Sequence, residues 1–418
     1  MSASDFQELH TVTPPLRWRN TTVAQRHTVV AAGLGWMLDS FDVMLYSIVL
    51  VTLMREFGMD KKTAGLLNTL TLIASAIGSF IFGILADRFG RRRMLSASIL
   101  TYSLFTFACG FTTTITALAV CRFLLGLGMG GEWNTGATLV AETWPSAWRA
   151  RAMSLVQSSW AIGYALAATV AGIVLSHASW RWVFFIGVFP ALVTFWIQRD
   201  VPEPELWRRQ REMKEPIDKR PLWRKSAPSI LALLGMNTFG MFAWWGLFTW
   251  IPAYLALPAS KGGRNFSELG FTTFLIILNL CGMFPGYLLF GWIADRVGRK
   301  PALVLYLALA ALSVPAFAAA RSPGLILLTA SITAFFGTGF FVGSGVLGSE
   351  LFPTAIRATA LGVSYNFGRG ISAFAPFIIG AIGETLGLNW GFAACGAAFA
   401  CAMACALLLP ETVGAELT

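Results

Sequence analysis

The chain has 418 residues, of which 56% are hydrophobic and only 12% are charged, and its mean hydropathy is +0.65. Soluble domains carry about 25% charged residues, so this composition excludes an ordinary soluble protein and indicates many membrane-spanning helices. The net charge of +10 does not indicate nucleic-acid binding. The basic residues lie in short stretches between apolar runs, where they set membrane topology.

The apolar runs predict twelve membrane-spanning helices, because about 20 apolar residues suffice to cross a bilayer. In chain order they are 28–54, 63–86, 94–112, 115–140, 150–175, 181–198, 229–257, 268–293, 301–320, 323–347, 357–383 and 388–409. We therefore predict an all-α polytopic membrane protein in which two six-helix bundles are joined by a polar linker. Its parts are a tail (1–27), a first bundle (28–198), a linker (199–227), a second bundle (228–410) and a tail (411–418). The linker is interpreted as a plain tether; the alternative is that it carries one surface helix.

Most of the 31 Lys and Arg residues fall in the N-terminal tail, the linker and every second loop. Since basic loops stay in the cytoplasm, this distribution predicts a multi-pass protein of the cell inner membrane with both termini cytoplasmic. No short apolar segment with a small-residue cleavage site precedes the first run, so a cleaved signal peptide is not expected. The six cysteines lie inside apolar runs without metal-ligand spacing, which predicts neither a metal site nor disulfides.

Two acidic residues, Asp39 and Asp42, lie near the middle of the first apolar run. They are three positions apart, so both lie on one face of the predicted helix. A carboxylate in mid-bilayer costs about 3 kcal/mol on insertion scales and normally faces a water-filled path or a cation. We interpret the pair as a proton or cation site; the alternative is a pair of structural acids neutralised by a fixed arginine.

The fourth run contains Arg122 in its outer part and Glu132 at greater depth, too far apart to pair directly. We expect Arg122 to lie beside an acid of the first run, with Asp42 at the closer depth, and to tune its proton binding. The alternative is a permanent ion pair between the two helices. Glu132 is either a second proton site or a contact that holds a neighbouring helix.

Arg369 lies about midway along the eleventh run and needs an anion there. The second bundle offers no other acid at that depth, so the anion is expected to be the substrate, because a guanidinium matches a carboxylate in bidentate fashion. The alternative is a pair with Asp39 or Asp42 across the cavity. Five further residues are expected to line the binding site: Trp160, Tyr164, Trp245, Asn279 and Asn366.

Two motifs recur at one offset of 208 residues, from Gly83 to Gly291 and from Glu142 to Glu350. Parallel repeats of this kind are typical of transporters built from two related halves. Both motifs lie on the predicted cytoplasmic side and are expected to form a charge latch that closes it; the alternative is that they only set topology. The expected latch residues are Gly83, Asp87, Arg88, Gly90, Arg91, Glu142, Arg149, Asp295, Arg296, Glu350 and Arg357.

The paired loops Gly83–Arg92 and Gly291–Lys300 resemble the hallmark of the major facilitator superfamily, over about residues 26–411. The Pro-Glu stretches after the sixth and twelfth runs are similar to those of its sugar-and-other-transporter branch. Within that branch, the stretches 122–133, 141–145 and 182–190 most resemble the sialate/lactate (carboxylate):proton symporters. The Asp39–Asp42 stretch resembles the Asp-Gly-[Tyr/Phe]-Asp signature of the aromatic-acid:proton symporters, with Ser40 at the glycine position.

The resemblance implies a proton-coupled symporter of a small organic carboxylate that works by alternating access. Its expected partners are the organic anion, the proton as coupling ion and anionic lipids at the cytoplasmic loops, with no other cofactor, no nucleic acid and a monomeric state. The alternatives are a neutral-sugar or drug transporter of the same superfamily and a non-transporting membrane sensor. Walker-type, Gly-x-Ser-x-Gly and His-Glu-x-x-His motifs are absent from the sequence, so an enzyme or an ATP-driven pump is not expected.

Overall fold

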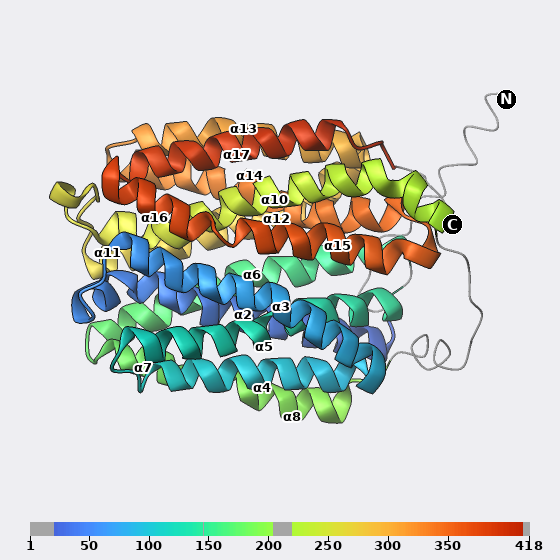
Figure 1. Cartoon of the computed structure of the whole chain (residues 1–418), viewed down its shortest axis with the longest axis horizontal. Helices are drawn as coiled ribbons and strands as arrows, with labels where there is room; N and C mark the ends of the chain where they lie inside the picture. Colours follow the sequence, from blue (N-terminus) through green and yellow to red (C-terminus); the bar gives the residue numbers. More distant parts are fainter. Residues whose placement is uncertain (1–20, 145, 204–219, 413–418) are drawn as a thin grey trace.

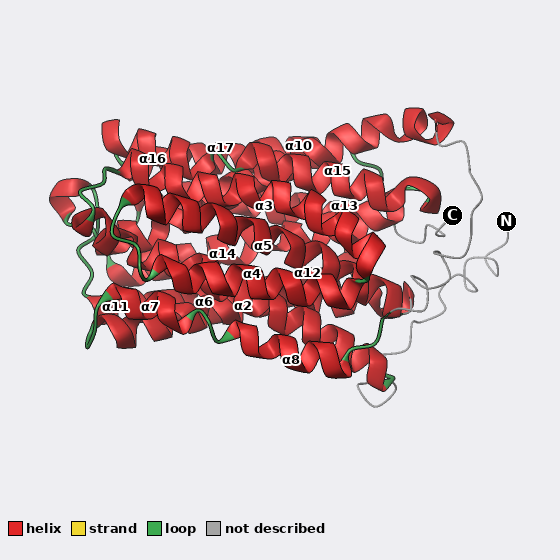
Figure 2. Ribbon diagram, turned by 60° about the horizontal axis from the view of Figure 1, so that its bottom comes forward, coloured by secondary structure: helices red, strands yellow, loops and turns green. Residues whose placement is uncertain are grey.

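The computed structural model describes residues 21–144, 146–203 and 220–412. Within these ranges the chain is helical without a strand, and its helices run side by side along the long axis of the molecule (Figures 1 and 2). Among the described residues, ten segments are long and apolar enough to cross a membrane. Two further crossings, one beginning with three arginines and one broken near its middle, complete the twelve that the sequence predicts.

The first half consists of α2 (Val23–Glu56), α3 (Lys61–Phe89), α4 (Arg91–Cys109), α5 (Ile115–Thr143), α6 (Ser146–Leu175), α7 (Trp180–Ile186) and α8 (Pro190–Asp200). The second half consists of α10 (Arg220–Ala256), the short η2 (Ala259–Lys261), α11 (Glu268–Ile277), η3 (Leu278–Met283), α12 (Phe284–Val297), α13 (Arg299–Ala319), α14 (Pro323–Leu351), α15 (Thr354–Ser372), α16 (Ala375–Thr385) and α17 (Leu388–Leu407). The structure thus has the all-α architecture expected from the sequence.

Three crossings that the sequence predicts as continuous helices are interrupted in the structure. The sixth is split into α7 and α8, the eighth contains the π-helical turn η3, and the eleventh is split into α15 and α16. A proline stands at the start of each downstream helix, namely Pro190, Pro285 and Pro376. Because proline has no backbone N–H and its ring clashes with the preceding turn, the regular hydrogen bonding stops there and a new helix begins.

The helices also extend beyond the predicted apolar runs. α2 begins at Val23, where Thr22 and Gln25 form a capping box: each side chain accepts a hydrogen bond from the other residue's backbone N–H. α10 begins at Arg220, inside the stretch assigned to the linker. Hydropathy marks the part of a helix that lies in lipid, whereas capping and backbone hydrogen bonds decide where the helix ends.

The two halves meet where α3 packs against α15 and α16, α6 against α11 and α12, and α2 against α10. One end of the molecule holds the turns between α3 and α4 and between α12 and α13, and we name it the basic end. The other, where α3 begins at Lys61, we name the Lys61 end. At the Lys61 end the halves are bonded directly: the Lys61 backbone N–H donates to Glu384 (3.2 Å) and its Nζ donates to the carbonyl of Gly383 (3.0 Å).

Closer to the centre, Asn68 Nδ2 donates to Thr249 Oγ1 across the same interface (2.9 Å). Gly65 lies so close to α16 that a Cβ atom there would come within 2.4 Å of the carbonyl oxygen of Pro376. These contacts close the gap between α3 and α16 at the Lys61 end and hold the two halves together there.

Candidate functional site

A small cavity lies between the halves, near the middle of the molecule. It is lined by Trp36, Gln157, Trp160, Met241, Trp244, Trp245, Tyr287, Phe341, Tyr365 and Arg369. Its volume is about 20 Å³, counted as the space open to the centre of a water-sized sphere. Since one such sphere needs about 10–15 Å³, the cavity has room for little more than one water molecule, and a larger ligand requires its walls to separate.

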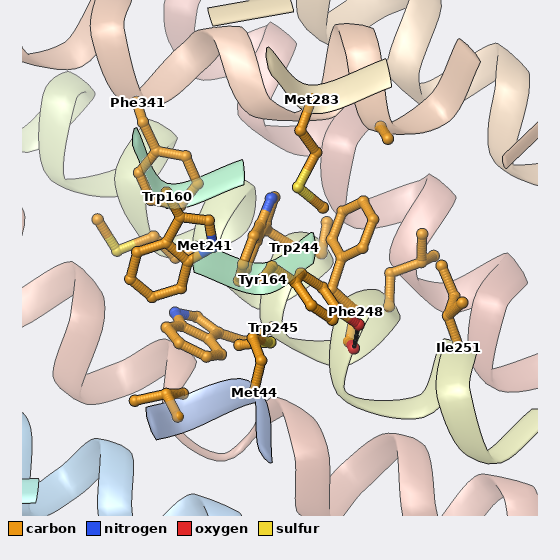
Figure 3. Packing of buried hydrophobic residues seen from close by; sticks show 14 of the residues in the cluster. Met44, Trp160, Tyr164, Met241, Trp244, Trp245, Phe248, Ile251, Met283 and Phe341 are labelled. Carbon is orange, nitrogen blue, oxygen red and sulfur yellow. Dashed lines mark hydrogen bonds between the residues drawn. The ribbon is translucent and has the colours of Figure 1, made fainter. Parts of the chain in front are cut away.

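Aromatic rings from both halves form most of the wall (Figure 3). In the first half, the ring centroid of Trp36 lies 4.7 Å from that of Trp160. In the second half, Trp244 and Trp245 pack edge to face at 4.9 Å, and Trp160 meets Trp244 across the interface at 5.7 Å. Aromatic faces offer a large, rigid and apolar contact area to a flat ligand.

Arg369 supplies the positive charge of the cavity. It lies in the last turn of α15, just before the break, and only 3% of the residue is exposed. Its Nη1 has no hydrogen-bond partner, and no carboxylate of the described residues lies within ion-pair distance. A buried guanidinium in this condition is ready to bind an anion.

The three buried acids of the described residues, Asp39, Asp42 and Glu132, differ in their hydrogen bonding. Both carboxyl oxygens of Asp39 lack a partner, as does the Oε2 of Glu132. Glu132 reaches α2 because Gly35 has no side chain: a Cβ there would lie 2.5 Å from Glu132 Oε1. Asp42 instead accepts a hydrogen bond from Thr106 of α4 (3.2 Å). The two aspartates that share a helix face in the sequence therefore have different neighbours.

The expected pair between Arg122 and Asp42 is wrong for this structure. The Arg122 guanidinium lies 4.1 Å from the centre of the Tyr46 ring and donates through Nη2 to Asn68 Oδ1 (2.8 Å). Arg122 is fully buried, and its Nε and Nη1 have no partner. Because Asn68 also bonds Thr249, Arg122 is linked through Asn68 to the contact between the halves. The depth of Arg122 along its predicted crossing could not show whether its partner is an acid on α2 or an amide on α3.

Two of the five other predicted binding residues, Trp160 and Trp245, line the cavity with Arg369. The other three do not. The hydroxyl of Tyr164 donates to the carbonyl of Phe248 (3.4 Å), and the amide of Asn279 donates to Leu275 in its own helix (2.8 Å). Asn366 is 6% exposed but lies outside the lining.

Several lining residues are absent from the predicted binding set, among them Trp36 and Gln157, although Gln157 is one of the few amides that the sequence offers to a cavity. Trp36 lies three positions before Asp39, and Gln157 lies three positions before Trp160. Residues three apart share a helix face, so this spacing was a signal that could have identified both.

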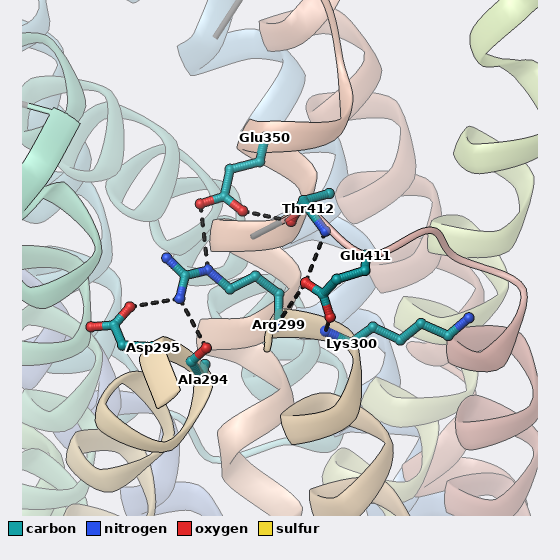
Figure 4. Close-up of polar contacts among 7 residues, drawn as sticks. All are labelled: Ala294, Asp295, Arg299, Lys300, Glu350, Glu411 and Thr412. Atoms are coloured by element: carbon teal, nitrogen blue, oxygen red, sulfur yellow. Dashed lines mark hydrogen bonds and ion pairs between the residues drawn. The ribbon is translucent and has the colours of Figure 1, made fainter. Parts of the chain in front are cut away.

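At the basic end, arginines of the repeated motif form ion pairs between neighbouring helices within each half. Arg91 donates to the carboxylate of Glu142 (3.1 Å) and to the carbonyl of Ala86 (3.0 Å). In the second half, Arg299 bonds Asp295 (2.6 Å) and lies 3.5 Å from Glu350 (Figure 4). Each of these three ion pairs joins two helices of the same half.

The remaining latch residues differ in their roles. Arg88 and Arg296 are exposed and lie over aromatic rings of their own helices, Phe89 and Trp292. Gly90 has a φ of +108°, which favours glycine, and so makes the tight turn between α3 and α4. Gly83 has open space around it and contributes no close contact. The side chains of Asp87, Arg149 and Arg357 lie outside the described residues.

Two glutamates complete this arrangement, and the sequence analysis did not include them in the latch. Glu203 accepts hydrogen bonds from the first two backbone N–H groups of α4, at Arg91 (2.9 Å) and Arg92 (3.1 Å). Glu411 does the same for α13, at Arg299 and Lys300 (3.0 Å each; Figure 4). Glu203 and Glu411 are again 208 residues apart. A carboxylate is favourable at a helix N-terminus, where unpaired N–H groups and the helix dipole are positive.

The chain matches the family model of the Major Facilitator Superfamily over residues 32–284 and 256–417. A probable 4-methylmuconolactone transporter of Cupriavidus pinatubonensis is 35% identical over 93% of this chain and 91% of its own length. The cis,cis-muconate transport protein of Acinetobacter baylyi is 32% identical over 91% and 93%, and the sialic acid transporter NanX of Escherichia coli is 30% identical over 89% and 91%.

Among solved structures, a partially occluded inward-open conformation of the xylose transporter XylE from E. coli superposes with a TM-score of 0.75. It is 18% identical and covers 95% of this chain and 100% of its own. At 18% identity this similarity shows that the two proteins share a fold, and it shows nothing about the substrate. Together with the twelve crossings and the repeated loops, these matches confirm the family expected from the sequence. The chain belongs to the major facilitator superfamily and is a multi-pass membrane transporter rather than an enzyme.

Proposed function

We propose that the protein is a proton-coupled symporter that carries a small organic carboxylate, with Arg369 as the residue that binds the carboxylate. The observation that carries this proposal is the buried guanidinium at the central cavity, with no carboxylate of the described residues within ion-pair distance. An unpaired buried charge is strongly unfavourable, and a substrate carboxylate would remove that cost with two charge-assisted hydrogen bonds. Relatives named for transport of muconate and sialic acid, both carboxylates, support the same substrate class.

A neutral sugar is less well supported. It would leave the Arg369 charge without a counter-ion when the cavity closes around it. The structural similarity to a xylose transporter concerns the fold at 18% identity and does not extend to the cavity.

Arg369→Gln should weaken binding of carboxylate substrates about 100-fold, because a bidentate charge-assisted pair of hydrogen bonds is lost. The measurement is calorimetric titration of purified protein with a panel of benzoate, nicotinate, muconate, lactate and sialate. Arg55→Gln is the matched control, since Arg55 is an exposed arginine outside the cavity and the predicted latch. Full retention of affinity in Arg369→Gln, or no binding of any carboxylate to the unsubstituted protein, would refute the proposal.

For the proton, we propose Asp39 together with Glu132. Both carboxyl oxygens of Asp39 and the Oε2 of Glu132 lack a partner, whereas Asp42 accepts a hydrogen bond from Thr106. A cavity that takes up one anion and one proton closes with little net buried charge. Asp39→Asn should therefore abolish accumulation driven by a pH gradient in proteoliposomes while leaving exchange of preloaded substrate, and Asp42→Asn should impair accumulation less. Undiminished accumulation in Asp39→Asn would contradict this assignment.

We also propose that the basic end faces the cytoplasm in the inner membrane and that the protein works as a monomer. The concentration of Lys and Arg in the loops at that end supports this orientation. In this orientation the closed Lys61 end faces outward. Labelling of single cysteines at Lys62 and Arg296 with a membrane-impermeant reagent in intact cells tests it: only the first should react.

A further inference from the structure

The cavity wall holds a set of hydrogen-bond donors that nothing in the protein satisfies. The indole N–H groups of Trp36, Trp160 and Trp244, the Gln157 Nε2 and the Arg369 Nη1 are all buried without a partner. All five residues line the same cavity. The lining residues also carry three side-chain acceptor oxygens, namely the Gln157 Oε1 and the hydroxyls of Tyr287 and Tyr365. The unpaired donors outnumber them and include the guanidinium, so the site favours a ligand that mainly accepts hydrogen bonds.

These donors are divided between the two halves. Arg369 and Trp244 belong to α15 and α10 of the second half, while Trp36, Gln157 and Trp160 belong to α2 and α6 of the first. A carboxylate offers about four acceptor sites, of which a guanidinium in bidentate contact takes two. One carboxylate at Arg369 therefore cannot satisfy all of the donors, and another part of the same ligand is needed for the rest. Each buried donor left unpaired costs about 1–3 kcal/mol, so the closed cavity favours a ligand that satisfies both sets.

We propose that the transported acid is a flat molecule that carries a second hydrogen-bond acceptor beyond its carboxylate, and that Gln157 is the residue that recognises this second acceptor. This inference rests on the proposed carboxylate function. The aromatic wall selects the flat skeleton, Arg369 binds the carboxylate, and Gln157 with the neighbouring indoles binds the second acceptor, which is a ring nitrogen, a carbonyl or a second carboxylate. Such a ligand bonds both halves at once, which stabilises the ligand-bound state once the walls have separated to admit it.

Matched pairs of acids test the proposal. Nicotinate and isonicotinate differ from benzoate by one ring nitrogen, and cis,cis-muconate differs from sorbate by a second carboxylate in place of a methyl group. Calorimetric titration of the unsubstituted protein should give about tenfold tighter binding for at least one member with the second acceptor than for its partner without it. Equal affinities within every pair, with binding that still depends on Arg369, would overturn the inference while leaving the carboxylate function intact.

The variant Gln157→Leu keeps a side chain of similar size without the amide donor. It should reduce the affinity ratio of the pair about tenfold, because the loss falls on the acid that bears the second acceptor. Leu155→Ala, a lipid-facing change on the same helix at a residue 42% exposed, should leave the ratio as in the unsubstituted protein. Gln157→Glu, which replaces the donor by an acceptor, should reduce the ratio further. An unchanged ratio in Gln157→Leu or Gln157→Glu would refute the assignment of Gln157.

Discussion

Gly65→Ala should shift the protein towards a state that is open at the Lys61 end. A Cβ at position 65 would lie 2.4 Å from the carbonyl oxygen of Pro376 and 3.0 Å from the Cα of Phe377. Ordinary contact begins at 3.4 Å, so α3 and α16 must separate by about 1 Å, and the atoms in the way are backbone atoms that cannot rotate aside. Overpacking of this kind costs about 1–3 kcal/mol, which changes the ratio of closed to open protein by about 5- to 150-fold.

The measurement is the distance between two spin labels at the Lys61 end, on Lys62 of α3 and on Leu386 just after α16, with the six native cysteines replaced. Gly65→Ala should add or enlarge a population with a longer distance. Gly33→Ala is the control, because Gly33 is also helical but has nothing within 4 Å of its Cβ position. An unchanged distance distribution in Gly65→Ala would show that the close approach of α3 and α16 does not hold this end shut.

Two further predictions concern stability and gating. Glu203→Gln should lower the free energy of unfolding by about 1–2 kcal/mol, because the charge that caps α4 is lost, and Glu411→Gln should cost a similar amount since it caps α13 with equivalent hydrogen bonds. Thermal unfolding in detergent at one scan rate measures both, and unchanged midpoints would contradict the capping role. Asn68→Leu should open the Lys61 end more than Thr249→Val does, because it also strips Arg122 of its acceptor. The spin-label distance at the Lys61 end measures both substitutions. If they lengthen this distance equally, Arg122 does not contribute to holding the end closed.

The sequence alone was sufficient to predict the fold class, the number of crossings and the two-fold repeat. Lipid imposes these features, because each crossing must be a long apolar helix and each charged loop must remain in water. For the same reason the buried charges were recognisable: Asp39, Glu132, Arg122 and Arg369 stand out in apolar runs. Even the capping glutamates left a sequence trace, since Glu203 and Glu411 share the offset of the other repeated motifs.

Only the tertiary structure decided which of these residues meet. Helix spacing places Asp39 and Asp42 together, yet the approach of α5 at Gly35 brings Glu132 close to Asp39, while α4 brings Thr106 to Asp42. Arg122 donates a hydrogen bond to Asn68 and lies over the Tyr46 ring, rather than pairing with an acid. The partners of a buried side chain depend on the rotation and crossing of helices that are far apart in the sequence. Those are set by side-chain packing between helices, which apolar periodicity in one helix does not record.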